Sequence, residues 1–326
     1  MKLRVGTFNL FQFCSPPFSF YTKKEKFTPE EWNEKIAWCK NQLNLMNCDI
    51  VGFQEVFSND ELKNLCLEVG FKYFEIVDFA KVDKKNEKVY ISTTVAIASK
   101  FPIINIEKID TKNFKFARIP IKAIISLPNE KNITVYITHL KSNRENEFEY
   151  IFTKNDTLED KLKKVEVALK DNYSLSLKQR INEAKILFYD IKSNKTPTIL
   201  MCDLNDKEFS ITIDALTNKR FYNRNLKKDD YLLFDAYYLH KPKIYNPHPE
   251  FKGIKRTPTS YFAGKGNILD YIFVSKELQK IISYEVFDKH LQKNHNGNLK
   301  QSDHAQVVCE IGEYPFNCVN SKISIY

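Results

Sequence analysis

The chain has 326 residues, of which 43% are hydrophobic, and only 8 are glycine and 12 are proline. A chain of this length and apolar fraction can bury a substantial core, which excludes a disordered or fibrous protein. Its formal net charge of +9 is compatible with a polyanionic partner such as nucleic acid, and equally with a generic lysine-rich composition.

Seven cysteines are spread along the chain without a C-x-x-C pair, and several lie in apolar surroundings. This pattern predicts reduced, buried thiols rather than a disulfide framework. No run of about 18 apolar residues is present, and the first residues pass directly into a strand pattern. We therefore expect a soluble, cytoplasmic and monomeric protein without a transmembrane segment.

In chain order, the first predicted element is an alternating strand over residues 3–8, which ends at Asn9. An aromatic, proline-containing loop follows it. A helix is then expected from Thr28, because Thr28 and Glu31 fit a capping box and Pro29 occupies the first helical position. Apolar residues along this helix recur with a 3.6-residue period, so one face should pack on a core.

The next predicted elements are an apolar strand that ends near Glu55 and a second helix that continues to about Val69. Ser58 and Glu61 repeat the capping-box pattern at the start of this helix. From residue 71 to residue 138 the pattern predicts strands alone. These strands cover residues 73–77, 89–98, 103–109, 119–127 and 133–138, with hairpin turns at 83–88 and 128–132.

The strand series ends at His139, and the character of the chain then changes. Residues 142–175 are charged and lack a strand pattern, so we interpret them as an insertion or mobile loop with helical pieces. The remaining expected elements are a helix over 177–191 and strands over 198–201, 267–275 and 304–312. We expect one mixed α/β domain over residues 1–326, with helices framing two groups of strands.

Polar side chains recur where the predicted strands end. They are Asn9, Glu55, His139, Asp203, Asn205, Asp303 and His304, with Asp270 inside a strand. Each alone has a structural explanation, since Asp and Asn commonly close turns. Their recurrence at the strand ends of one domain favours a catalytic site, because catalytic groups gather on loops that rigid strands hold in place.

These residue types suit the hydrolysis of phosphodiesters. Carboxylate and amide oxygens bind Mg²⁺, which offsets charge on the phosphate and on the leaving oxygen. A further carboxylate can orient or deprotonate a water molecule, while histidine and arginine stabilise the phosphoryl oxygens. No P-loop, G-x-G-x-x-G or H-E-x-x-H pattern competes with this interpretation.

Eight short motifs occur in a fixed order between residues 5 and 308. They are TFNL, DIVGFQEVF, VAIASKFPI, FARIPIKAIIS, ITHLKS, MCDLND, ILDYIFVS and SDHAQV. With these motifs the chain resembles the endonuclease/exonuclease/phosphatase superfamily, which includes deoxyribonucleases, abasic-site endonucleases, neutral sphingomyelinases and inositol-polyphosphate 5-phosphatases. In appearance it is closest to bacterial members of the superfamily.

The resemblance implies a four-layered αββα sandwich, in which helices flank two mostly antiparallel or mixed β-sheets and the site lies at one rim. It also implies that Asn9 and Glu55 hold Mg²⁺, with Mn²⁺ as a substitute, and that Asp303 adds a metal contact.

For the catalytic residues, the resemblance implies that Asp203 orients and activates the attacking water, with Asn205 positioning Asp203 or the phosphate. His304 would contact the scissile phosphate, and Asp270 would orient His304. His139 would support the phosphate or protonate the leaving group.

Three further positions bear on the substrate. Arg118 matches an arginine that approaches phosphate in the deoxyribonuclease-like branch, so we expect it to bind substrate. Phe11 stands where some nucleases of the superfamily carry an acidic residue, which argues against a second metal there. His139 stands where abasic-site endonucleases have a tyrosine, which disfavours that activity.

The expected function is a Mg²⁺-dependent nuclease acting on DNA or RNA, with nucleic acid as its partner. Basic stretches at 23–26, 161–170 and 252–256 would track a phosphate backbone, and the aromatic loop over 11–21 would either stack bases or pack on the core as a lid. The alternative is a phosphomonoesterase or a lipid or inositol phosphoesterase. A non-catalytic binding module is disfavoured, because every matched position carries a chemically competent residue.

Overall fold

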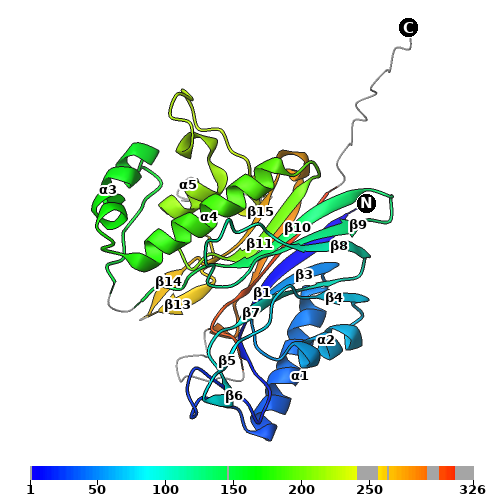
Figure 1. Cartoon of the computed structure of the whole chain (residues 1–326). Helices are drawn as coiled ribbons and strands as arrows, with labels where there is room; N and C mark the ends of the chain where they lie inside the picture. Colours follow the sequence, from blue (N-terminus) through cyan, green and yellow to red (C-terminus); the bar gives the residue numbers. More distant parts are fainter. Residues whose placement is uncertain (1, 145–146, 241–255, 263, 292–300, 313–326) are drawn as a thin grey trace, which may run out of the picture.

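The computed structural model describes residues 2–144, 147–240, 256–262, 264–291 and 301–312. Two six-stranded sheets lie face to face between two groups of helices (Figure 1). In each sheet one neighbouring pair of strands is parallel and the others are antiparallel. The predicted four-layered αββα sandwich of mixed sheets is confirmed.

The first sheet has the strand order β16-β17-β1-β3-β7-β4. Its strands are β1 (Leu3–Phe13), β3 (Ile50–Val56), β4 (Tyr73–Glu75), β7 (Thr94–Ser99), β16 (Ile281–Phe287) and β17 (Gln306–Ile311). The second sheet has the order β12-β15-β11-β10-β9-β8. Its strands are β8 (Ile103–Lys108), β9 (Ile121–Ser126), β10 (Asn132–His139), β11 (Thr198–Asp203), β12 (Phe234–Asp235) and β15 (Asp270–Val274).

Helices and small sheets complete the fold. The helices are α1 (Pro29–Met46), α2 (Asn59–Glu68), α3 (Leu158–Lys170), α4 (Leu175–Ser193), α5 (Ile211–Thr217) and α6 (Ala236–Leu239), with 3₁₀ turns at Lys219–Phe221 and Lys276–Leu278. The small sheets are formed by β2 (Ser19–Phe20), β5 (Val82–Asp83) and β6 (Asn86–Tyr90), and by β13 (Ser260–Phe262) and β14 (Lys265–Asn267). Among the helices in the described ranges, none combines the length and apolarity needed to cross a lipid bilayer.

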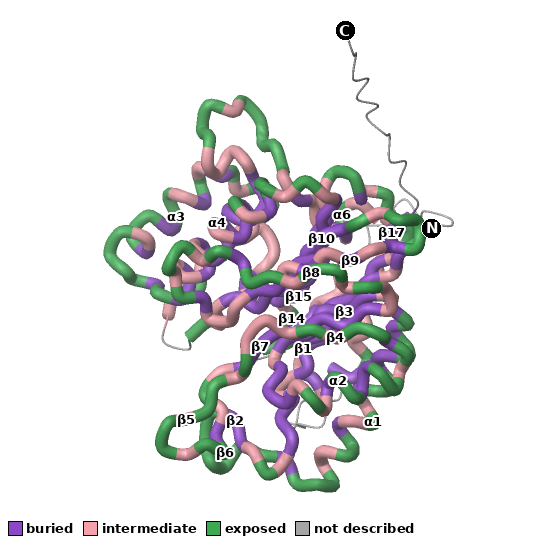
Figure 2. Tube along the Cα trace, turned by 45° about the vertical axis from the view of Figure 1, so that its right-hand side comes forward, coloured by how far each residue is buried: buried purple, intermediate pink, exposed green. Residues whose placement is uncertain are grey.

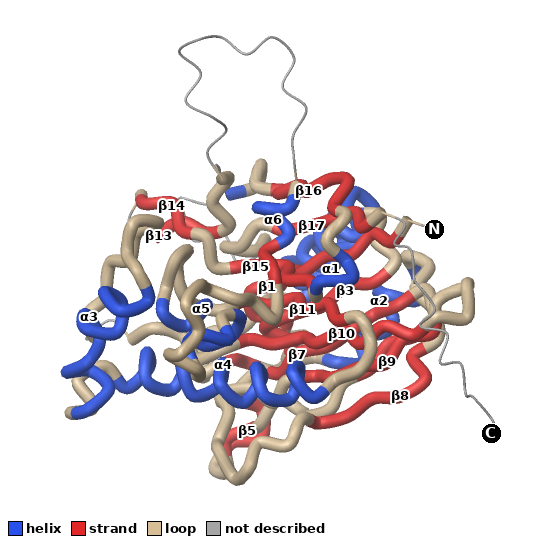
Figure 3. Tube along the Cα trace, turned by 90° about the horizontal axis from the view of Figure 1, so that it is seen from above, coloured by secondary structure: helices blue, strands red, loops and turns tan. Residues whose placement is uncertain are grey.

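Three apolar layers hold the sandwich together. Alternate side chains of the two sheets, such as Val5 and Ile137, interlock in a central cluster. Helices α1 and α2 cover the outer face of the first sheet, and α3, α4 and α5 cover that of the second. The buried trace therefore runs through the strands, and α4 lies along one flank of the second sheet (Figures 2 and 3). This layering fixes the strand ends that carry the polar residues.

One of the two predicted capping boxes is present. At α1, the Thr28 and Glu31 side chains accept hydrogen bonds from each other's backbone N–H at 2.9–3.2 Å, as expected. At α2 the helix forms, but the Ser58 side chain makes no capping bond and instead accepts from the backbone N–H of Ser15 at 2.8 Å. Glu61 accepts from the Ser15 hydroxyl at 2.7 Å, so both residues hold the aromatic loop rather than the helix end.

The charged segment 142–175 includes a helix that is part of the core. Helix α3 contributes Leu158 and Val165 to the apolar cluster it shares with α4 and α5. Lys161 donates to Asp214 of α5 at 2.7 Å, and both side chains are about nine-tenths buried. Residues 158–170 are therefore a packed helix and not a mobile loop.

The packing of α3 predicts a large effect of breaking this buried ion pair. Lys161→Met is expected to lower the free energy of unfolding by about 3–5 kcal/mol, because it leaves the buried Asp214 without its cation. Lys161→Met/Asp214→Leu should recover most of the loss. As a control, Lys164→Met breaks an exposed pair with Asp156 and should cost less than about 1 kcal/mol. Urea unfolding measures all three, and equal effects of the two single changes would show that α3 is detached.

The six cysteines in the described ranges are all free and buried. Burial raises the pKa of the Cys14 thiol to about 12 and that of Cys39 to about 11, so both stay protonated and unreactive at neutral pH. These thiols fit the expected reduced state, and Cys318 lies outside the described residues.

Candidate active site

Strand register brings the predicted polar residues together. β10 and β11 are parallel neighbours, so His139 lies opposite Asp203 at their carboxyl ends. β15 runs antiparallel to β11, and its first residue, Asp270, lies opposite Asp203 from the other side. Three residues that are far apart in the sequence thus form a row across one rim of the second sheet. The first sheet supplies Asn9 to the same place.

Asp203 is the centre of this cluster and is fully buried. Its Oδ2 accepts a hydrogen bond from Asn9 Nδ2 at 2.9 Å and lies 3.4 Å from His139 Nε2 and 3.9 Å from His304 Nδ1. Its Oδ1 accepts from the backbone N–H of Asn205 at 2.8 Å. Burial raises the pKa of Asp203 to about 7, although the His304 charge opposes this shift. A carboxylate with a pKa near neutrality is suited to general base chemistry.

His304 carries the positive charge of the cluster. Its Nδ1 lies 2.8 Å from Asp270 Oδ2, and Ser302 Oγ accepts from its backbone N–H at 3.0 Å. Burial alone would lower the pKa of His304. The carboxylates of Asp270, Asp203 and Asp303 outweigh burial and raise this pKa well above its usual value. A cation held in this way can stabilise phosphoryl oxygens.

His139 differs from His304 in its charge. It is buried, and within the described chain its Nδ1 has no hydrogen-bond partner. Burial lowers the pKa of His139 well below its usual value, and the charges of Arg118, His304 and Lys141 lower it further. His139 is therefore neutral, and its environment does not suit a standing phosphate-binding cation.

Asn9 and Glu55 lie beside an irregular stretch of strand. β1 carries two more residues than β3 between their pairs Asn9–Gln54 and Phe13–Val56, so β1 bulges there. Phe11 and Gln12 have φ of 49° and 58°, and their backbone N–H groups donate to Asn9 Oδ1 and Glu55 Oε2, each at 3.0 Å. Glu55 itself has φ of 60°. Left-handed conformations at non-glycine residues store strain, and such strain is concentrated at functional sites.

The three predicted metal ligands suit a hard divalent cation. Asp303 Oδ1 is buried and, among the described residues, has no hydrogen-bond partner. Ser302, next to it, donates to the backbone oxygen of Asn9 at 2.6 Å, which ties Asp303 to the part of β1 that carries Asn9, beside the strand β3 that carries Glu55. Carboxylate and amide oxygens are the ligands that Mg²⁺ prefers.

A second grouping of possible metal ligands is also present. Single ligand atoms of Asp203, Asp270 and His304 lie within 4.8 Å of one another. In this group the His304 Nδ1 is already hydrogen-bonded to Asp270 Oδ2, and Asp203 Oδ2 accepts from Asn9. Atoms in such bonds must give them up to coordinate a metal, whereas Asp303 Oδ1 has no hydrogen-bond partner among the described residues. The Asn9, Glu55 and Asp303 oxygens are therefore the better candidates.

Asn205 and Arg118 are placed by the same backbone oxygen. Asn205 Nδ2 and Arg118 Nη1 both donate to Leu140 O, at 3.1 and 2.9 Å. Asn205 adopts φ of 49°, which turns the chain directly after β11 and allows its N–H to bind Asp203. Leu204, between Asp203 and Asn205, is buried in the core, as the strand pattern implies.

Two supporting residues are absent from the sequence-based prediction. Lys35 of α1 is fully buried and donates to Leu10 O at 2.9 Å, next to the β1 bulge. The signal for it is its place in the apolar stripe of α1, three residues after Trp32 and four before Cys39. Ser302 carries no comparable signal, because a serine before a strand is unremarkable until its contacts are seen.

The predicted basic stretches do not form a shared cationic surface. In the segment 161–170, Lys161 is buried against Asp214, and Lys164 and Lys170 are paired with acidic neighbours. Arg256 is also buried, 2.6 Å from Asp235, while 252–255 lie outside the described residues. These cations are neutralised within the fold. Lys23, Lys24 and Lys26 are exposed and have no ion pair among the described residues, so the phosphate-binding role of stretch 23–26 stays a prediction.

The aromatic loop packs mainly on the protein itself. Phe20 is fully buried in a cluster with Phe27 and Phe57, and Phe13 packs against α1. Tyr21 is the exception and is 47% exposed. Of the two alternatives for residues 11–21, the lid that packs on the core is therefore the one observed, apart from Tyr21.

A four-layered sandwich with acidic, amide and imidazole groups at one rim defines a class of phosphoester hydrolases. The sequence profile of the Endonuclease/Exonuclease/phosphatase family matches residues 6–304, and the chain belongs to this family. Its members hydrolyse phosphoester bonds and are generally dependent on divalent metals.

Solved structures share the fold at low sequence identity. Humanized D. rerio TDP2 is 12% identical with a TM-score of 0.58, over 96% of this chain and 99% of that one. The human nocturnin catalytic domain with bound sulfate is 17% identical with a TM-score of 0.52, over 95% and 94%. A family protein from Leptotrichia buccalis is 16% identical with a TM-score of 0.53, over 95% and 100%. A search of the curated proteins found no sequence relative.

Proposed function

We propose that the protein is a Mg²⁺-dependent phosphodiesterase that cleaves DNA or RNA. The observation that carries the proposal is a pair of buried groups, Asp203 and His304, whose side-chain atoms lie 3.9 Å apart. The pKa of Asp203 is near 7, so its carboxylate can accept a proton, and the pKa of His304 is raised, so its imidazole is positively charged. Two neighbouring groups, one able to accept a proton and the other held protonated by its environment, are typical of the base and the acid of a catalytic site. In addition, D. rerio TDP2, which shares the fold, is complexed with a single-strand DNA product.

In this mechanism Asp203 accepts a proton from the attacking water. Asn9 and Asn205 donate to its two carboxylate oxygens, which fixes their direction. Protonated His304, held by Asp270, faces the phosphoryl oxygens and stabilises the charge that develops on them. Neutral His139, 3.4 Å from Asp203, helps to orient the phosphate.

The oxygens of Asn9, Glu55 and Asp303 are the proposed ligands of the metal. A divalent cation held there would offset charge on the phosphate and on the leaving oxygen. The backbone donors of Phe11 and Gln12 keep the Asn9 and Glu55 oxygens in place before the metal binds.

The proposal is tested with a panel of substrates. Single- and double-stranded DNA, RNA, sphingomyelin, inositol phosphates and p-nitrophenyl phosphate are incubated with the protein and Mg²⁺, Mn²⁺, Ca²⁺ or EDTA. Cleavage of nucleic acid with Mg²⁺ supports the proposal. Turnover confined to lipid or inositol phosphates would replace it with the alternative phosphoesterase function.

Metal dependence gives a specific prediction for Glu55. Glu55→Gln keeps the side-chain shape but replaces a charged ligand with an amide, so the Mg²⁺ concentration for half-maximal rate should rise by roughly tenfold or more. Glu61→Gln, which alters a carboxylate on the neighbouring helix, is the matched control and should leave that concentration unchanged. Titration of Mg²⁺ against the rate gives both values, and full activity in excess EDTA would contradict a metal mechanism.

A further inference from the structure

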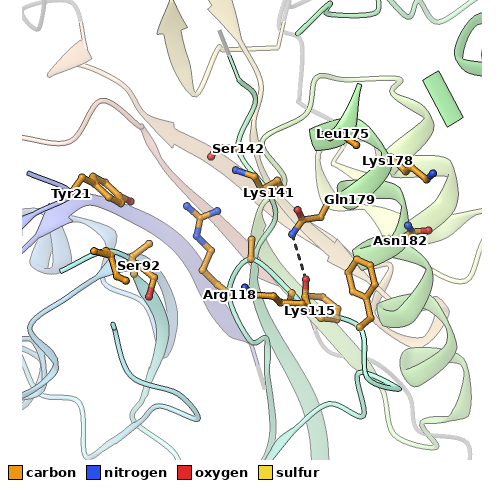
Figure 4. Close-up of a pocket in the computed structure, with 15 residues that line it drawn as sticks. Tyr21, Ser92, Lys115, Arg118, Lys141, Ser142, Leu175, Lys178, Gln179 and Asn182 are labelled. Carbon is orange, nitrogen blue, oxygen red and sulfur yellow. Dashed lines mark hydrogen bonds between the residues drawn. The ribbon is translucent and has the colours of Figure 1, made fainter. Parts of the chain in front are cut away.

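A cleft of about 620 Å³ opens beside the candidate active site. One wall is formed by the β1–α1 loop and the strand connection before β7, with Tyr21 and Ser92 (Figure 4). The opposite wall is the first half of α4, with Lys178 and Asn182. Arg118 projects into the space between the two walls, and its guanidinium shares Leu140 O with Asn205. The cleft therefore adjoins Asn205 of the proposed site of cleavage through Arg118 and Leu140.

The charged side chains that line this cleft are all positive. Its lining contains four cations, Lys115, Arg118, Lys141 and Lys178, and no carboxylate. Within the described ranges, none of the four side-chain cations lies within 4.0 Å of a carboxylate oxygen, although the backbone N–H of Lys141 donates to Glu183 at 2.9 Å. The cations of segment 161–170 named above are paired. Burial lowers the pKa of Lys141, and the charges of Arg118 and Arg144 lower it further, against the opposing effect of the Glu183 and Glu147 carboxylates. Four cations that outnumber the carboxylates around a concave site are suited to an anionic ligand.

The cleft also has an apolar side. Tyr21, Ile91 and Leu175 are each 47–49% exposed there, and Phe114 adds a second aromatic ring. Exposed rings next to cations are the combination with which proteins bind single-stranded nucleic acid, because unpaired bases stack on aromatic faces while phosphates meet the cations. A phosphate-only ligand would leave this apolar surface in water.

The size of the cleft distinguishes a single strand from a duplex. A sphere with the volume of the cleft is roughly 11 Å across, whereas the major groove alone of B-form DNA is about 12 Å wide. The cleft can take up a few unpaired nucleotides but cannot enclose a double helix.

We propose that this cleft binds a single-stranded segment of nucleic acid next to the scissile phosphate, with phosphates on Lys115 and Lys178 and a base on Tyr21. The inference rests on the proposed nuclease function and specifies its substrate as single-stranded. The duplex next to such a segment would remain outside the cleft.

The test measures binding without turnover. Fluorescence anisotropy in EDTA compares a labelled single-stranded oligonucleotide with its duplex at 50–200 mM salt, chosen as a range over which phosphate contacts weaken strongly. The intact chain is expected to bind the single strand more tightly. Lys115→Ala/Lys178→Ala should weaken that binding and lower the slope of log affinity against log salt by about 0.7 for each lost contact.

Helix α4 supplies a matched control. Lys192→Ala/Lys195→Ala removes the same charge at the other end of the helix, about 21 Å from Lys178 along its axis. Both lysines are exposed, and this variant should bind like the parent. Tyr21→Leu should weaken single-strand binding by roughly tenfold, whereas Tyr21→Phe, which keeps the ring, should not.

Two results would overturn the assignment. One is equal affinity for single strand and duplex, and the other is an equal effect of the two double-lysine variants. Failure of the proposed function is a separate observation, since a chain that cleaves no nucleic acid with Mg²⁺ could still bind a single strand in this cleft. Conversely, if the protein cleaves nucleic acid but these substitutions do not change its binding, the proposed function stands and the proposed binding site is wrong.

Discussion

Asp203→Asn is expected to lower the rate of phosphodiester hydrolysis by roughly a hundredfold or more. The change removes the negative charge that accepts the proton of water and keeps the shape of the side chain. One oxygen remains to accept a hydrogen bond from Asn9 or from the Asn205 backbone, which now hold the carboxylate at 2.9 and 2.8 Å. Folding and substrate binding should therefore largely survive.

The pH dependence of the rate identifies the reason for the loss. Since burial raises the pKa of Asp203 to about 7, the parent rate should rise with pH as the carboxyl loses its proton near neutrality, and fall below it. We call this fall in rate below neutral pH the acidic limb of the profile. Asp203→Asn should leave a small residual rate that lacks the acidic limb. Asp206→Asn is the comparison: Asp206 lies three residues away and is bound to Arg180, so it should affect stability and not the limb.

These measurements can contradict the role of Asp203. Initial rates from pH 5 to 9, with thermal unfolding of each variant, provide them. Near-normal turnover by a folded Asp203→Asn protein would exclude Asp203 as the base, even though the fold remained as described. An unchanged acidic limb in the variant would assign the titration near neutrality to another group.

The row of residues across the second sheet could be predicted because strand ends are visible in sequence. Apolar runs that stop at His139 and Asp203 predict that a strand ends at each residue, and the parallel register of β10 and β11 in the structure then places the two end residues side by side. Asp270 was recognised through its motif, and the register then places it opposite Asp203. The position of each residue along its own strand is local information, so the sequence carries it.

Features that depend on contacts between distant segments were not predictable. The two extra residues in β1 and the positive φ of Glu55 arise where β1, β3 and β7 meet, and no local pattern marks them. The Ser58–Glu61 pattern is chemically a capping box, but Ser15 competes for both side chains. Strand β16 was missed because its side chains are only partly buried and show no clear alternation.

The grouping of cations on the surface also depends on contacts between distant segments, so it could not be predicted from the sequence. In segment 161–170, Lys161, Lys164 and Lys170 are paired with acidic groups, whereas the cations of the cleft come from segments 115–118, 141 and 178. A linear count of basic residues therefore does not identify the cleft. Only the packing of α4 beside the ends of β9 and β10 brings the cleft cations together.

His304→Ala is expected to be about as damaging as Asp203→Asn, because it removes the buried cation that faces the phosphoryl oxygens. The residual rate should lie roughly a hundredfold or more below that of the parent. His304→Gln, which keeps a donor but no charge, should recover only part of the activity. Turnover by His304→Ala within a few-fold of the parent would exclude this role.

Asp270→Asn tests whether Asp270 acts through its negative charge on His304 or only through its structural role. The Asp270 carboxylate is 2.8 Å from His304 and helps to raise the pKa of that imidazole well above its usual value, against the effect of burial. Without this carboxylate, His304 should lose its proton at a lower pH, so the alkaline limb of the rate profile should move to lower pH. A purely structural role for Asp270 would lower the unfolding temperature and leave the limb in place. Because the rate requires Asp203 deprotonated and His304 protonated, the active range of pH should narrow from its alkaline side.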